Sequence, residues 1–440
     1  MNQICKPDAA LALLKLSQKP QSGLSYIPSQ FVLPFTHNEK QYAFHMLTKE
    51  LVETELPRSA HAGEGFDPLI ESMFLVPEGK DECAFYESIS ALKRLYAQKK
   101  GIPCYTILPT LGCNARCVYC YEEGRKQIRM TRETAEETVR YILRTHDRDK
   151  VKLNWFGGEP LLCPGIIDYV SDELQRANVP FHSTMVSNGS LVTQQILDKM
   201  LTDWKLKRIQ VSMDGAEQDY IDRKRYHGNS DRYHFVLRAI DAMSEAGIAV
   251  SVRCNVDEDN WAGIPAFLTD MNRYIPHKEH VGIYFSPLGD VRTGDGEIAL
   301  WKKILAARPL IEDAGFRPLP YMEPRMKLRV NFCMADGGSV VIGPDGSLYA
   351  CEHCPTNSRF GDVFHGVTDE AARREFCRTD RTREKCRRCP FLPDCTSFAS
   401  CPWVDVHCRE VREMIALDAL KRIVDHKETN QDSDEDDLVC

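Results

Sequence analysis

The sequence predicts an α/β fold around a parallel sheet, with a smaller module before it and a cysteine-rich segment after it. Two observations support this prediction. Six β-type runs alternate with helical patterns between residues 101 and 310, and cysteines concentrate at 113–120 and again from 333 to 408. Alternating strands and helices favour parallel pairing, because each crossover helix returns the chain to the end where the strand began. Reactive residues of such sheets lie on the loops after the strands.

The helical segments of the middle zone repeat apolar residues every three or four positions, as Ala135, Val139 and Ile142 do. Between these segments lie runs rich in β-branched and aromatic residues, which indicate strands. The predicted strands are 104–109, 151–156, 180–187, 208–213, 249–254 and 281–286.

Residues 1–100 are predicted to form a separate module. The runs 31–35 and 42–46 flank a polar segment and so predict a β-hairpin, in which Pro34 favours an edge strand. A helical pattern follows from Phe85 to Leu95.

Composition narrows the class of protein. The chain has 440 residues, enough for two or three domains, and its net charge of −8 argues against a nucleic-acid partner. Neither a signal peptide nor a membrane-spanning run is visible, so we expect a cytoplasmic protein with no membrane partner. In that reducing compartment, 18 cysteines indicate metal ligation more than disulfides.

Three cysteines follow the first predicted strand with the spacing C-x3-C-x2-C: Cys113, Cys117 and Cys120. Three thiolates from one loop can bind three irons of a [4Fe–4S] cubane and leave the fourth iron open to a chelating ligand. The alternative is a zinc site, but structural zinc takes four closed ligands and no fourth lies nearby.

With Tyr119 before its last cysteine, this loop resembles the signature of the radical S-adenosylmethionine superfamily. The segment Trp155-Phe156-Gly157-Gly158-Glu159-Pro160 resembles the glycine-glycine-glutamate-proline motif of that family, and further motif residues follow at later strand ends. The resemblance implies a partial (β/α)6 TIM-type barrel over 101–310, a [4Fe–4S] cluster and bound S-adenosylmethionine. The cofactor-binding residues that it implies are Tyr119, Gly157, Gly158, Glu159, Pro160, Ser187, Asn188, Ser212, Asp214 and Arg253.

The resemblance also implies roles for some of these residues. The glycines permit close approach to a ligand, and Glu159 offers an acceptor to the methionyl ammonium. Ser212 is a candidate ribose contact, and Arg253 stands where relatives bind the carboxylate. A plain strand-to-helix turn would explain the glycines but not the glutamate. The bound cofactor would then supply a 5′-deoxyadenosyl radical, which abstracts hydrogen from a C–H bond.

The later cysteines, within 311–428, resemble the SPASM extension, which binds two auxiliary [4Fe–4S] clusters. The family pattern assigns Cys386, Cys389, Cys395 and Cys408 to the distal cluster, and Cys333, Cys351 and Cys401 to the nearer one. Cys354 is the fourth ligand of the nearer cluster unless that cluster keeps an open iron. A pair of zinc knuckles is the alternative. The acidic end, 429–440, predicts a disordered tail.

Relatives with a SPASM extension mostly modify peptides or proteins. The module 1–100 resembles the winged-helix-like leader-recognition domain of ribosomal-peptide maturases, with a structural extension as the alternative. We therefore expect a maturase that makes intramolecular thioethers in a precursor peptide, with Glu352 as a candidate base and a flavodoxin- or ferredoxin-type electron donor. Formation of carbon–carbon crosslinks or of formylglycine is the alternative activity. An iron–sulfur electron carrier or sensor is the alternative class, but it needs no cofactor pocket.

Overall fold

The computed structural model describes residues 2–5, 18–98, 101–147, 151–228, 232–288, 295–321, 323–324, 338–352, 359–376, 384–395 and 408–429. The chain divides into two compact units. The first comprises Met1–Tyr96, Met322–Phe332 and Thr379–Cys440, and the second comprises Ala97–Tyr321 and Cys333–Arg378. These units cut across the ranges 1–100, 101–310 and 311–428, because the C-terminal segment is shared between them. The functional assignments of those ranges stay predictions.

The second unit is built on one large sheet in the order β14-β13-β12-β11-β10-β9-β8-β15-β16-β17-β18. Each of the six predicted strands is present in it, and successive ones pair in parallel. They are β8 (Cys104–Ile107), β9 (Val151–Trp155), β10 (Phe181–Ser187), β11 (Leu206–Met213), β12 (Ala249–Val256) and β13 (Val281–Pro287). The predicted α/β class and parallel sheet are confirmed. Within the described residues no pairing closes this sheet into a barrel.

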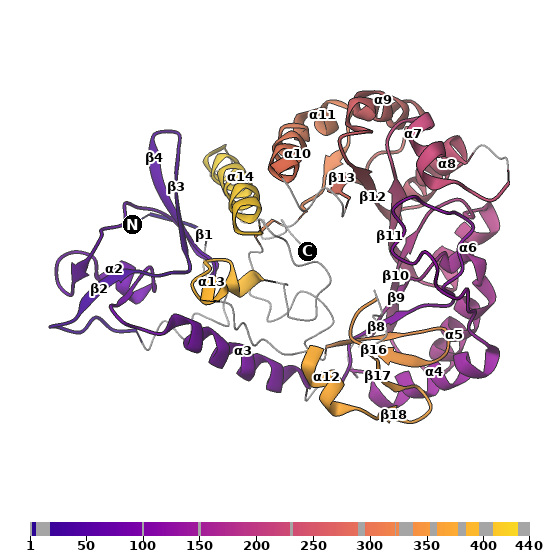
Figure 1. The fold of residues 1–440 in the computed structure, drawn as a ribbon, viewed down its shortest axis with the longest axis horizontal. Coiled ribbons are helices and arrows are strands. Elements are labelled where there is room, and N and C mark those ends of the chain that lie inside the picture. Colours follow the sequence, from indigo (N-terminus) through magenta and orange to yellow (C-terminus); the bar gives the residue numbers. More distant parts are fainter. Residues whose placement is uncertain are drawn as a thin grey trace. The chain divides into compact units, whose positions relative to one another are not determined.

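Helices line the outer face of this curved sheet (Figure 1). In chain order they are α4 (Arg132–Thr145), η1 (Pro160–Leu162), α5 (Pro164–Arg176), α6 (Gln194–Thr202), α7 (Glu217–Lys224), α8 (Tyr233–Glu245), η2 (Trp261–Gly263), α9 (Ile264–Tyr274), α10 (Asp295–Ala306) and α11 (Arg308–Asp313). Alternate strand residues therefore differ in character. In β11, Ile209, Val211 and Met213 are fully buried, whereas Gln210 and Ser212 between them are polar and partly exposed.

Short strands from the C-terminal segment extend the sheet beyond β8. β15 (Ser339–Ile342) pairs in parallel with β8, and β16 (Ser347–Tyr349), β17 (Arg359–Asp362) and β18 (Gly366–Val367) follow in antiparallel order. β14 (Arg317–Pro318) pairs with β13 at the other end, and α12 (Glu370–Phe376) follows β18. The sequence showed little periodicity here because strands of two to four residues are too short to display it.

The first unit contains two antiparallel sheets, with the orders β1-β5-β4-β3 and β6-β2-β7. The predicted hairpin is present as β3 and β4, and its turn residues Asn38 and Glu39 have left-handed φ values of 47° and 63°. β3 is an edge strand that contains Pro34, as expected. The strands are β1 (Asn2–Cys5), β2 (Ser25–Pro28), β3 (Val32–His37), β4 (Lys40–His45), β5 (Leu51–Glu53), β6 (Ala60–His61) and β7 (Leu75–Pro77).

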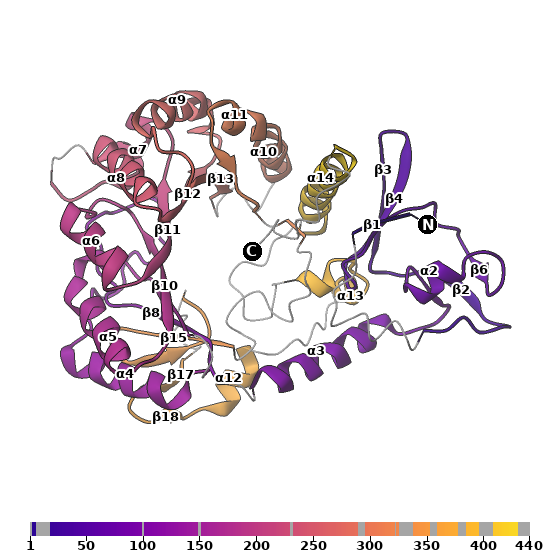
Figure 2. The same ribbon diagram turned by 180° about the vertical axis from the view of Figure 1, so that it is seen from behind.

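The helical elements of this unit come from both ends of the chain. They are α2 (Asp67–Glu71), α3 (Glu82–Gln98), α13 (Glu384–Arg387), η6 (Leu392–Asp394) and α14 (Cys408–Thr429). Figure 2 shows α14 beside the β3–β4 hairpin, where His37 Nε2 lies 2.6 Å from Asp425 Oδ1. None of the described helices is long and apolar enough to span a bilayer.

One hydrophobic core joins the N-terminal strands to the C-terminal cysteine segment. Phe31 and Phe44 belong to the same buried cluster as Phe391 and Leu420. Beside this core, Lys49 Nζ lies 2.6 Å from Asp394 Oδ1, and both side chains are almost completely buried. The N-terminal strands therefore share one hydrophobic core with the C-terminal segment. A winged-helix-like fold stays a prediction.

Candidate functional site

The loop that carries Cys113, Cys117 and Cys120 is closed at its base. Thr110, just after β8, forms an antiparallel bridge with Arg129. On either side of this bridge, Leu111 N donates to Ile128 O at 2.9 Å and Met130 N donates to Pro109 O at 2.8 Å. The chain between these pairs is thus held like the end of a hairpin, and the cysteines lie within it. We call the segment from residue 111 to 128 the cysteine loop.

The two glycines after β9 pack directly on the backbone of the cysteine loop. Gly158 N donates to Thr110 O at 3.1 Å, and Glu159 N donates to Gly112 O at 2.9 Å. A Cβ atom on Gly157 would lie 2.3 Å from Thr110 O, and one on Gly158 would lie 2.3 Å from Gly112 O. The close approach expected of these glycines is therefore made to the loop itself, and their contact with a cofactor stays a prediction.

The other side of the cysteine loop is fixed by the end of α7. Arg116 N donates to Lys224 O at 3.0 Å and Val118 N donates to Arg223 O at 3.0 Å. Arg225, with a left-handed φ of 47°, ends the helix. The loop is thus held by main-chain hydrogen bonds from three parts of the fold: its own base, the end of β9 and the end of α7.

Glu159 is a fully buried carboxylate that joins the ends of β9 and β10. It accepts hydrogen bonds from Leu161 N at 3.1 Å, Ser187 Oγ at 2.9 Å and Asn188 N at 2.8 Å. Burial raises the pKa of Glu159 to about 6, although these hydrogen bonds oppose the rise. A carboxylate has about four acceptor positions, so one remains for a ligand ammonium. That contact stays a prediction, as do those of Pro160, which begins η1, and of Ser187.

Asn188 brings a side-chain amide to the first cysteine. Its Nδ2 donates to Asn114 Oδ1 at 2.8 Å and lies 3.8 Å from Cys113 Sγ, and Ala115 N also donates to that sulfur at 3.4 Å. N–H groups directed at sulfur are a feature by which proteins tune iron–sulfur clusters. Burial raises the pKa of the Cys113 thiol to about 11, so a bound metal is needed to hold this sulfur as a thiolate at neutral pH.

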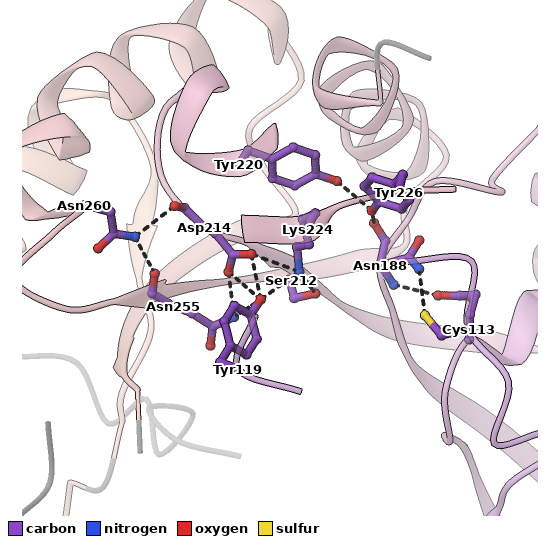
Figure 3. A network of polar contacts seen from close by, with 11 residues as sticks. Cys113, Tyr119, Asn188, Ser212, Asp214, Tyr220, Lys224, Tyr226, Asn255 and Asn260 are labelled. Atoms are coloured by element: carbon purple, nitrogen blue, oxygen red, sulfur yellow. Dashed lines mark hydrogen bonds and ion pairs between the residues drawn. The ribbon is translucent and has the colours of Figure 1, made fainter. Parts of the chain in front are cut away.

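Tyr119 lies at the centre of a buried polar network (Figure 3). Its hydroxyl donates to Asp214 Oδ1 at 2.7 Å and accepts from Asn255 Nδ2 at 3.0 Å and Lys224 Nζ at 3.1 Å. Lys224 and Asp214, each at most 1% exposed, form an ion pair with an N–O distance of 3.3 Å. Burial alone would lower the pKa of Lys224, but Asp214 and the other acidic groups around it together outweigh this, and the net shift is upward. Asp214 thus holds other side chains, and its own contact with a cofactor stays a prediction.

Two further candidate cofactor residues lie side by side on the neighbouring strands β11 and β12. Ser212 is the register partner of Arg253, and Ser212 Oγ accepts from Lys224 Nζ at 2.8 Å. Arg253 Nε is buried and has no hydrogen-bond partner within the described parts of the chain. The Ser212 hydroxyl proton and this guanidinium N–H are therefore left to donate to a ligand, as the predicted ribose and carboxylate contacts require.

The donor set of the cysteine loop is one that a cubane takes. Cys113, Cys117 and Cys120 form no disulfides. Across the described residues, no three His, Cys, Asp or Glu side chains converge as ligands of one metal ion. A cubane makes no such demand, because each thiolate binds a different iron. Three unbonded thiols on one anchored loop, with N–H groups facing one sulfur, suit such a cluster.

The later cysteines divide between the two units. Cys351 follows β16 in the second unit, and burial raises the pKa of its neighbour Glu352, whose Oε2 is 3.9 Å from Cys351 Sγ. In the first unit, Cys386 lies in α13, Cys389 N donates to Cys386 O at 3.2 Å, and Cys395 follows η6. Cys408 begins α14. Cys333, Cys354 and Cys401 lie outside the described residues, and the ligand and base assignments of the whole set stay predictions.

Sequence reasoning missed Lys224 and Asn255. Lys224 is the last residue of α7, where it resembles any charged residue of a solvated helix end. Asn255 was accessible to prediction, because it lies two positions after Arg253 and therefore on the same face of β12.

Known proteins match this region of the chain. Residues 107–269 match the model of the Radical SAM superfamily. Mycofactocin maturase MftC of Mycobacterium tuberculosis is 27% identical over 262 residues, which are 56% of this chain and 64% of MftC. The antilisterial bacteriocin subtilosin biosynthesis protein AlbA of Bacillus subtilis is 23% identical over 271 residues, 58% of this chain and 56% of AlbA. This chain thus matches less than two thirds of the length of either protein.

A solved structure shows the same fold. Native anSMEcpe with bound AdoMet superposes with a TM-score of 0.58 at 18% identity, covering 74% of this chain and all of that chain. A radical SAM domain implies a [4Fe–4S] cluster and S-adenosylmethionine as its cofactors. The parallel sheet, the anchored cysteine loop and these similarities lead to one conclusion: residues 107–269 match the Radical SAM superfamily, and this region is similar to a mycofactocin maturase and a bacteriocin biosynthesis protein.

Proposed function

We propose that this chain is a radical S-adenosylmethionine peptide maturase that joins a cysteine sulfur to a carbon of another residue in a ribosomally made precursor peptide. The observation that supports it most directly is the anchored cysteine loop, in which the Cys113 sulfur lies beside Asn188 and Tyr119 contacts Asp214. MftC is named as a maturase and AlbA as a bacteriocin biosynthesis protein, and these names favour a peptide substrate over the other substrates of the superfamily. We further propose a cytoplasmic location and neither a membrane nor a nucleic-acid partner.

With its cluster and S-adenosylmethionine bound, the site supplies a 5′-deoxyadenosyl radical. Cys113, Cys117 and Cys120 would hold the cluster. Arg253 would bind the cofactor carboxylate. The Ser212 oxygen already accepts a hydrogen bond from Lys224, and its hydroxyl would donate a hydrogen bond to the ribose. The chain's own part is to orient the cofactor on rigid strand ends and to exclude water.

Thioether formation removes two hydrogens and two electrons from the peptide. One hydrogen atom leaves a C–H bond and converts the radical to 5′-deoxyadenosine. The thiol proton goes to a base, for which Glu352 is the candidate, and the remaining electron needs an acceptor. We propose that an auxiliary cluster would take up this electron, and that a flavodoxin- or ferredoxin-type donor would supply the electron needed to cleave the cofactor. The proposed cluster ligands are Cys386, Cys389, Cys395 and Cys408 for one site and Cys333, Cys351, Cys354 and Cys401 for the other.

The N-terminal strands offer a place for a peptide leader. β3 is the last strand of its sheet, and an extended peptide can add to such an edge through main-chain hydrogen bonds. Pro34 removes one donor from this edge, so pairing would use the residues around it.

The test is turnover by reconstituted protein with dithionite, S-adenosylmethionine and a short cysteine-rich precursor peptide. We expect 5′-deoxyadenosine and a peptide that lacks two hydrogens and no longer reacts with iodoacetamide at the linked cysteine. Loss of two hydrogens with the thiol still reactive would identify a carbon–carbon crosslink instead, and loss of sulfur would identify formylglycine. Protein that carries a cubane yet forms no 5′-deoxyadenosine would refute the proposal.

A further inference from the structure

Asn255, at the carboxyl end of β12, presents a buried acceptor that the described structure leaves unsatisfied. The residue is 3% exposed. Its Nδ2 donates to Asp214 Oδ1 at 2.8 Å and to Tyr119 Oη at 3.0 Å. Its Oδ1 is buried and has no hydrogen-bond partner among the described residues. Figure 3 shows this oxygen turned away from the Asp214 carboxylate. A buried acceptor without a donor is costly, so native proteins satisfy it with a protein group, water or a ligand.

The orientation of the Asn255 amide follows from chemistry. If the amide were flipped, Oδ1 would face an Asp214 oxygen at hydrogen-bond distance, and two acceptors would oppose each other. A second asparagine holds the main chain at this strand end, because Asn260 Nδ2 donates to both Asp214 O and Asn255 O at 2.8 Å. The unsatisfied oxygen is therefore held in place by its neighbours.

A second unsatisfied group lies on the same face of β12. Arg253 precedes Asn255 by two residues, so both side chains leave the strand on one side. Arg253 Nε is a buried donor without a partner among the described residues, and Ser212 is its register partner on β11. One strand end thus presents a free donor and a free acceptor next to a candidate cofactor residue. A ligand with both an acceptor and a donor would satisfy the pair.

We propose that Asn255 Oδ1 accepts a hydrogen bond from the nucleoside half of the bound sulfonium cofactor, which makes Asn255 a specificity-determining residue of that site. This inference rests on the proposed function. The nucleoside carries two kinds of neutral donor, the ribose hydroxyls and the adenine amino group, and either suits a neutral amide oxygen. The cofactor ammonium is a poorer match, because the charged acceptor Glu159 lies among the residues predicted to bind it.

The test measures binding of S-adenosylhomocysteine, which lacks the reactive sulfonium, to cluster-reconstituted protein by calorimetry. We compare the wild type with Asn255→Leu and the milder Asn255→Ser. The analogues are the 2′-deoxy, 3′-deoxy and inosine forms of S-adenosylhomocysteine, each of which lacks one candidate donor. Asn272→Leu makes the same change at an exposed position of α9 and serves as the matched control. Iron content and the melting curve report on folding.

We expect Asn255→Leu to weaken S-adenosylhomocysteine binding about tenfold, the effect of one lost hydrogen bond. For the analogue that lacks the contacting donor, wild type and variant should bind equally, and that analogue identifies the ribose or the base as the partner. A purely structural role would weaken all four ligands by the same factor, and this outcome would overturn the inference, as would unchanged binding in both variants. Wild-type protein that carries a cubane but binds no S-adenosylhomocysteine would overturn the proposed function itself.

Discussion

The two units each place a buried lysine–aspartate pair beside a cysteine segment, but the pairs differ in their surroundings. Lys224–Asp214 lies under the cysteine loop and is shared with Tyr119, Ser212 and Asn255. In the second pair, Asp394 directly precedes Cys395, and Lys49 follows the N-terminal strand β4. The first pair connects the end of β11 to the end of α7. The second connects parts of the chain that are more than 300 residues apart.

This difference indicates what each cysteine segment depends on. The cysteine loop is held by main-chain hydrogen bonds to the ends of β9 and α7, so the parallel sheet alone can position it. Cys386 lies in the short helix α13, and Cys389 and Cys395 lie before and after the short helix η6. Such short helices cannot fold by themselves, and these are held by the hydrophobic core shared with the N-terminal strands. We therefore expect perturbations of the two units to have separable effects.

Removing a ligand from each segment should separate them most clearly. Cys117→Ala should abolish formation of 5′-deoxyadenosine, because a loop with two thiols cannot hold a cubane with one open iron. Cys389→Ala should keep part of the cofactor cleavage and end peptide modification. Cleavage assays with and without the precursor peptide, together with iron content, measure both effects. Full peptide modification by the Cys389 variant would show that Cys389 is dispensable. It would then contradict the expectation that the two cysteine segments differ in function.

Breaking the two ion pairs should cost similar stability in different places. Lys49→Met and Lys224→Met each remove the lysine cation from a buried ion pair, which typically costs about 3–5 kcal/mol. Hydrogen exchange should locate the Lys49 effect in β3–β5 and the Lys224 effect in the cysteine loop.

A second substitution tests whether the unpaired charge is the cause. Lys49→Met/Asp394→Leu should recover much of the stability that Lys49→Met loses, because both charges are then gone. Lys199→Met serves as the control, since its pair with Asp168 is partly exposed and should cost less than about 1 kcal/mol. Equal losses at Lys199 and Lys49 in urea unfolding would contradict the assigned role of burial.

The sequence predicted those parts of the fold whose pattern is local. Six strands with alternating helices were visible because each is long enough to show its period, and the cysteine loop because its spacing is compact. β15 was missed because its four residues gain meaning only from pairing with β8. The shared core of Phe44 and Leu420 was missed for a related reason, since no local pattern connects the two ends of a chain. Lys224 and Asn255 belong to the site through side-chain contacts that only the folded chain brings together.

The smallest expected effect concerns the carboxylate that joins β9 to β10. Glu159 has a folded-state pKa of about 6 against an ordinary value of 4.5, because burial disfavours its charge. Between these pH values the folded protein binds more protons than the unfolded chain does, so this residue lowers the free energy of unfolding as pH rises through that window, by about 2 kcal/mol in total.

Glu159→Gln cannot titrate and should lack this contribution. Urea unfolding of the two apo-proteins from pH 4.5 to 7 should therefore show their difference shifting by about 2 kcal/mol in favour of the glutamine variant, and parallel curves would mean that the folded site does not penalise the Glu159 charge.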